Sequence, residues 1–99
     1  MAHYVLLYEF VDDFLARRGA CRQEHLDQIW AAVERGEILL AGALEEPADS
    51  AILVFVGDGP EAAEEFARED VYTRDGLITK WSVRKWNTVA GELASNITR

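Results

Sequence analysis

Two side chains of this 99-residue chain, His25 and Asp70, have the chemistry of a general acid–base pair. Histidine is the residue type whose ordinary pKa lies closest to neutral pH, so its imidazole can accept and release a proton under physiological conditions. An aspartate that accepts a hydrogen bond from one ring nitrogen would orient the ring and leave the other nitrogen as general base or acid. We therefore treat His25 and Asp70 as candidate catalytic residues.

Both residues also fit a purely structural role. His25 precedes Leu26, at the edge of the apolar stripe of an expected helix, where a histidine without a chemical role is common. Asp70 ends a second expected helix, where a carboxylate meets the unfavourable end of the helix dipole but also suits a turn. We expect the two helices to run roughly parallel, which would separate an early position on one from a terminal position on the other. The sequence leaves open whether His25 and Asp70 meet.

Other common signatures of chemistry are absent. The chain has no Ser-His-Asp elbow, no phosphate-binding loop and no Cys/His spacing of a metal site. A metal bound through His25 and Asp70 would need further ligands, which the sequence does not offer in a cluster. We therefore expect no metal and no cofactor.

Composition and charge limit the kind of partner and compartment. Ten basic residues face 18 acidic ones, for a net charge of −8, which argues against nucleic acid because phosphate binding needs clustered Lys and Arg. No apolar run approaches the roughly 18–20 residues that span a bilayer, so no membrane partner is expected. The N-terminus lacks the features of a signal peptide, and Cys21 is the only cysteine. These features predict a cytoplasmic protein.

The apolar pattern predicts four strands and two helices in a single domain, residues 1–99, with a core of about 3–87 and a tail of 88–99. Strands are expected over residues 3–10, 37–43, 50–56 and 77–86. One helix should end at Gly36, after a separate helical turn over 14–18, and the other should begin at Pro60 and stop near Asp70. The order β-α-β-β-α-β is that of a ferredoxin-like α+β fold, with a four-stranded antiparallel sheet and both helices on one face.

Two expected strands are apolar on both faces. Val5 and Leu7 point to one side of the sheet while Leu6 and Tyr8 point to the other, and residues 50–56 show the same pattern. Two helices can cover only one face, so a second copy of the chain is expected to cover the other, forming a homodimeric α/β barrel. The alternative is that the C-terminal tail folds back over the open face.

Several short stretches resemble the YCII-related family in their order and spacing. They are HYVLLY at residues 3–8, RQEHL at 22–26, GEILLAG at 36–42, DVY at 70–72 and WSVRKW at 81–86. The resemblance covers roughly residues 3–87 and implies a ferredoxin-like fold paired as a dimeric α/β barrel. It also implies that His25 and Asp70 match the family's proposed acid–base pair. Two positions differ from the family pattern, since Val71 and Ala43 stand where prolines are frequent.

The resemblance further implies a cofactor-independent enzyme that acts on a small organic molecule by proton abstraction or elimination, as in lyase or dehydrohalogenase chemistry. Arg22 would then hold a substrate anion, and Tyr8, Tyr72 and Trp81 would supply aromatic walls. The alternatives are that Arg22 pairs with a neighbouring Glu and that these aromatic residues belong to the core. A second hypothesis is a non-catalytic small-molecule-binding or accessory dimeric domain. A third, a structural dimerisation module, predicts no pocket.

Overall fold

The computed structural model, which describes residues 1–99, contains one four-stranded antiparallel sheet with the order β2-β3-β1-β4. The strands are β1 (Ala2–Phe10), β2 (Ile38–Ala43), β3 (Ser50–Gly57) and β4 (Ile78–Trp86). The helical segments are α1 (Phe14–Arg17), the 3₁₀ turn η1 (Arg18–Ala20), α2 (Arg22–Glu34), α3 (Glu61–Glu69) and α4 (Val71–Arg74). This order confirms the predicted ferredoxin-like α+β fold, and α1 matches the helical turn expected over residues 14–18, whereas η1 and α4 were not expected.

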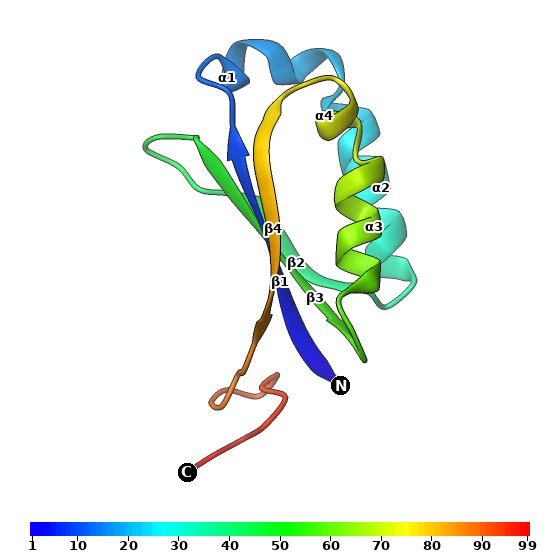
Figure 1. The fold of residues 1–99 in the computed structure, drawn as a ribbon, viewed down its shortest axis with the longest axis vertical. Helices are drawn as coiled ribbons and strands as arrows, with labels where there is room; N and C mark the ends of the chain where they lie inside the picture. Colours follow the sequence, from blue (N-terminus) through cyan, green and yellow to red (C-terminus); the bar gives the residue numbers. More distant parts are fainter.

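The helices lie on one face of the sheet, and the core fills the space between the two layers (Figure 1). Alternate residues of β1 and β3 point into this core, among them the fully buried Leu6 and Phe55. On β4, Trp81 and Val83 pair with Tyr8 and Leu6 and pack against the same core. The residues that point toward the helices therefore alternate along each strand with those on the opposite face, as the sequence predicts.

The C-terminus of α2 lies where the sequence predicted it, just before Gly36. Arg35 caps the helix and Gly36 adopts a left-handed conformation with φ of 79°. The Gly36 N–H bonds to the Val33 carbonyl and the Glu37 N–H to the Ala32 carbonyl, both at 2.9 Å. This is the Schellman pattern, which turns the chain sharply from α2 into β2.

The two long helices run in opposite directions, so the expectation that they run parallel is wrong. Because β1 and β3 are antiparallel, the helices that follow them return across the sheet in opposite senses (Figure 1). The start of α2 therefore lies beside the end of α3. This topology removes the separation that the sequence left open between His25 and Asp70.

The second face of the sheet carries no helix. Ile52 and Leu40 are 36% and 70% exposed on this side, and Val5, Leu7 and Val54 are only partly buried. The tail after β4 extends from one end of the sheet and leaves most of this face uncovered (Figure 1). It is tied there by a 2.7 Å hydrogen bond between Thr88 Oγ1 and His3 Nδ1.

Candidate active site

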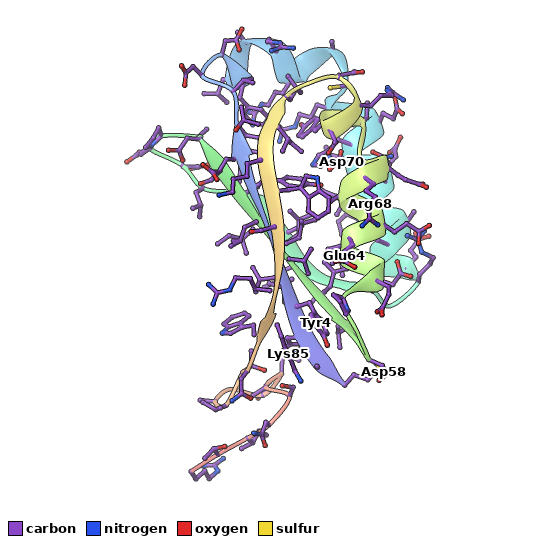
Figure 2. All side chains as sticks on the ribbon, viewed as in Figure 1. Tyr4, Asp58, Glu64, Arg68, Asp70 and Lys85 are labelled. Atoms are coloured by element: carbon purple, nitrogen blue, oxygen red, sulfur yellow. The ribbon has the colours of Figure 1, made fainter.

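Asp70 lies at the break between α3 and α4, where the backbone leaves helical geometry (Figure 2). Its side chain is completely buried. Oδ1 accepts a 2.9 Å hydrogen bond from the backbone N–H of Tyr72, which makes Asp70 the N-cap of α4. The carboxylate therefore serves the start of a second helix, so the unfavourable dipole contact expected at a helix C-terminus is offset by the favourable one at the next N-terminus.

His25 lies in the first turns of α2, and its Nδ1 is 2.8 Å from Asp70 Oδ1. An ionised carboxylate only accepts hydrogen bonds, so Nδ1 carries the proton of this contact. Nε2 has no protein partner, and no buried side-chain nitrogen or oxygen in the chain lacks one. Nε2 therefore reaches the solvent-accessible side of the ring, free to exchange a proton with a ligand.

Tyr8 completes the environment of the carboxylate from the sheet side. Its hydroxyl donates a 2.7 Å hydrogen bond to Asp70 Oδ2. Burial, followed by the negative charge of Asp70, raises the pKa of Tyr8 far above its ordinary value. Tyr8 thus remains a protonated donor at neutral pH, and Asp70 is held by donors from β1, α2 and α4.

Tyr72 orients the imidazole from its face. The rings of Tyr72 and His25 stack with centroids 3.7 Å apart and an interplanar angle of 10°. Phe14 meets Tyr72 edge-on at 5.5 Å. Burial raises the pKa of Tyr72, and the positive charge of Arg22 acts in the opposite direction.

A cavity of about 190 Å³ opens beside His25. Four of the predicted residues line it, namely His25, Arg22, Tyr8 and Tyr72, while Asp70 lies behind Tyr8 and His25. The other lining side chains are mostly apolar or small, and none is acidic. They are Phe10, Phe14, Arg18, Leu26, Ile29, Ala41, Gly42, Ala43, Ala51 and Leu53.

Sequence reasoning missed Arg18 and Phe14, which also line this cavity, and suggested Trp81, which lies elsewhere. Arg18 and Phe14 contribute a guanidinium that stands 5.6 Å over an aromatic ring. They come from α1 and η1, and the only signal for them was the helical turn predicted before Gly19. Trp81, a possible aromatic wall by its type, lies instead under the guanidinium of Arg68 on α3.

No group of three or more His, Cys, Asp or Glu side chains is placed to hold a metal ion. None of the helices combines the length and the hydropathy that a membrane span requires.

Comparison with known proteins identifies a family and a fold. The sequence model of the YCII-related domain family matches residues 2–87. No curated protein matches the chain significantly in sequence.

Three solved structures resemble the chain at low sequence identity. One is 5-chloro-2-hydroxyhydroquinone dehydrochlorinase from Burkholderia phenoliruptrix AC1100 in complex with 2,5-dihydroxybenzoquinone, with 15% identity, a TM-score of 0.73, and coverage of 87% of this chain and 94% of that one. Protein Atu4242 from Agrobacterium tumefaciens has 13% identity, a TM-score of 0.60 and coverage of 96% and 98%. A NIPSNAP family protein from A. tumefaciens C58 has 10% identity, a TM-score of 0.54 and coverage of 94% and 95%. At these identities the similarity shows the shared fold alone.

Proposed function

We propose that this chain, which belongs to the YCII-related domain family, is a cofactor-independent enzyme that acts on a small cyclic organic molecule. The observation that carries the proposal is the 2.8 Å contact between Asp70 and His25 Nδ1, with His25 Nε2 left without a protein partner beside a cavity. An imidazole held in this way by a carboxylate is the arrangement of a general base. The reaction class is elimination, of lyase or dehydrohalogenase type.

The proposed elimination begins with transfer of a proton from the bound ring to His25. His25 Nε2 takes a proton from a hydroxyl or carbon of the bound ring, and the electron pair of that bond moves into the ring system. The ring reacts as its keto tautomer, in which the carbon that bears the halide is saturated. The halide then departs with the electron pair of its own bond, so the net change is loss of HX without oxidant or reductant. Asp70 stabilises the imidazolium that forms, and His25 returns the proton to water.

Size and charge of the cavity indicate the substrate class. A cavity of about 150 Å³ is enough for benzene, so 190 Å³ suits a single ring with a few small substituents. Arg18 and Arg22 line it without any acidic neighbour in the lining, and neither guanidinium forms an ion pair within the chain. A phenolate or hydroxyquinone anion matches these features. The ring bound by the structurally similar dehydrochlorinase, 2,5-dihydroxybenzoquinone, belongs to this class.

The test incubates wild type with a panel of chlorinated and hydroxylated hydroquinones and follows chloride release and product. His25→Gln is expected to lower kcat by about 10²–10⁴-fold, the usual contribution of a general base. Arg22→Gln is expected to raise KM about tenfold with little change in kcat, because it removes a charged contact made equally in ground and transition states. His3→Gln, a change at the other buried histidine, is the matched control and should be neutral.

Two outcomes separate this proposal from its main competitor. Ring binding by wild type that weakens in Arg22→Gln, without turnover of any member of the panel, would favour a non-catalytic small-molecule-binding or accessory domain. Full turnover in His25→Gln would contradict an acid–base role for His25.

We also propose that the chain forms a homodimer through the open face of its sheet. The support is the row of partly exposed apolar side chains there, including Ile52, Leu40 and Val54. The charged residues on that face are Glu9, Lys80 and Arg84, so the acidic surplus of the chain lies elsewhere. A second copy would cover this surface and complete a dimeric α/β barrel.

A further inference from the structure

Gln28 contacts the backbone on both sides of Asp70. Its Nε2 donates a 2.9 Å hydrogen bond to the carbonyl of Glu69, and its Oε1 accepts a 2.9 Å hydrogen bond from the N–H of Val71. Gln28 lies three residues after His25, on the same side of α2. One face of one helix thus carries the ring that bonds to the Asp70 carboxylate and the amide that holds its neighbouring peptides.

The break between α3 and α4 leaves the Glu69 carbonyl and the Val71 N–H without partners inside a helix. Asp70 has φ of −59° and ψ of 131°, so α3 ends at Glu69 and α4 begins at Val71. The last carbonyls and first N–H groups of helices have no partner within their own helix. The remaining backbone groups of the break are paired, since the Asp70 N–H bonds to Phe66 and its carbonyl accepts from Thr73.

We propose that Gln28 is a positioning residue that fixes Asp70 relative to His25; this inference rests on the proposed function of that pair. The carboxylate can align with Nδ1 only if the peptide units next to it hold their place against α2. Gln28 fixes both peptide units from the helix that carries His25, so shifts of α2 and of the break are coupled. A side-chain amide suits this task because one end must donate and the other accept.

The identity of residue 71 provides an independent way to test the role. Val71 is the first residue of α4, where proline fits because its fixed φ matches the helix and the missing N–H is one that lacks a helical partner. The extended ψ of Asp70 is also the conformation that a residue before proline prefers. Val71→Pro therefore removes the group that Gln28 must satisfy and stiffens the same junction.

The experiment compares full-length wild type, Gln28→Leu, Gln28→Glu and the double variant Gln28→Leu/Val71→Pro. Proton NMR follows the His25 Nδ1–H resonance, which is visible only while its hydrogen bond slows exchange with water. Gln28→Leu is expected to speed this exchange by at least about tenfold and to lower kcat by a similar factor with KM nearly unchanged, because small misplacements of catalytic groups cost rate. The double variant should recover most of both losses. Gln23→Leu, at an exposed glutamine of α2 that bonds to Asp27, is the control and should match wild type.

Each result bears on the proposal separately from the enzyme hypothesis. Slow exchange retained in Gln28→Leu, or equal loss in the double variant, would overturn the positioning role. If Gln28→Leu does not fold, Gln28→Glu decides the matter: it keeps the acceptor for Val71 but repels the Glu69 carbonyl, so intermediate exchange is expected and wild-type exchange would overturn the role. Loss of the resonance in Gln28→Leu, with no turnover by wild type, would support positioning while contradicting the proposed enzyme.

Discussion

At the scale of single residues, the candidate site is organised around one buried carboxylate. Asp70 receives hydrogen bonds from the Tyr8 hydroxyl, the His25 imidazole and the Tyr72 backbone at 2.7–2.9 Å. A buried charge without such partners would cost several kcal/mol, so these donors are needed for stability as well as for chemistry. The same bonds fix which imidazole nitrogen is presented to the cavity.

Tyr8 makes the stability of the fold depend on pH in the alkaline range. An unfolded tyrosine loses its proton near pH 10, whereas burial and Asp70 raise the pKa of Tyr8 well above this value in the folded protein. Above pH 10 the unfolded state therefore binds fewer protons, and this contribution to the free energy of unfolding falls by about 1.4 kcal/mol per pH unit. Below pH 10 the contribution is fully present.

Tyr8→Phe is expected to be less stable than wild type at pH 7 by about 1–3 kcal/mol, because Asp70 loses a donor. The difference should shrink as the pH rises above 10, since the variant lacks this titration. Urea unfolding from pH 7 to 11 measures both effects, with Tyr4→Phe as a control that leaves the Tyr8 contribution in place. A constant difference between Tyr8→Phe and wild type across this range would contradict the assignment.

The sequence indicated His25 and Asp70 as candidates by their chemistry, but it did not indicate the contacts that surround them. His25 is one of two histidines and stands in a recognisable motif, so its type and context indicated it. Arg18 and Gln28 have no distinctive motif, and their roles arise from contacts with residues distant in sequence, such as Glu69 and Val71. Such long-range contacts depend on helix packing, which local patterns do not specify.

At the scale of elements, helix direction decides whether the site exists. His25 is early on α2 and Asp70 follows the end of α3, so these positions meet only because the helices are antiparallel. The predicted order of strands and helices already contained this information. In a split β-α-β arrangement, the inserted strand β3 is antiparallel to β1, so the helices that follow these two strands are also antiparallel to each other. Parallel helices are therefore incompatible with the predicted order of elements.

The end of α2 provides a paired test of helix termination. Gly36→Ala is expected to cost about 1 kcal/mol in the free energy of unfolding, because φ of 79° is unfavourable for a residue with a Cβ although no atom lies within 4 Å. Gly19→Ala also meets open space but has no positive φ, and it lies in the helical turn η1. Thermal or urea unfolding should therefore show Gly19→Ala to be neutral or slightly stabilising. Equal effects of the two substitutions would contradict the conformational explanation.

At the scale of the whole molecule, the two faces of the sheet differ in how well they are covered. The helix side contains the fully buried core, including Leu6, Leu53 and Phe55. On the other side, Ile52 and Leu40 are 36% and 70% exposed, and the tail lies near only one end of this face, beside Leu40 and Val54. A chain of this length buries only a modest core on its own. Burial of this apolar face against a second copy would therefore add substantially to the stability of the fold.

Ile52→Lys is expected to convert the proposed dimer into a monomer while leaving the fold intact. Ile52 pairs with Leu7 at the centre of the open face and is already 36% exposed, so one copy tolerates lysine there. The dimer would bury one lysine from each copy in an apolar interface, which should weaken association by at least about 100-fold. Sedimentation equilibrium at about 10 μM should give twice the 11.1 kDa chain mass for wild type and for Ala31→Lys, an equal charge change at an exposed position of α2. A wild type that sediments at 11.1 kDa would contradict the dimer, whereas a dimeric Ile52→Lys would place the interface elsewhere.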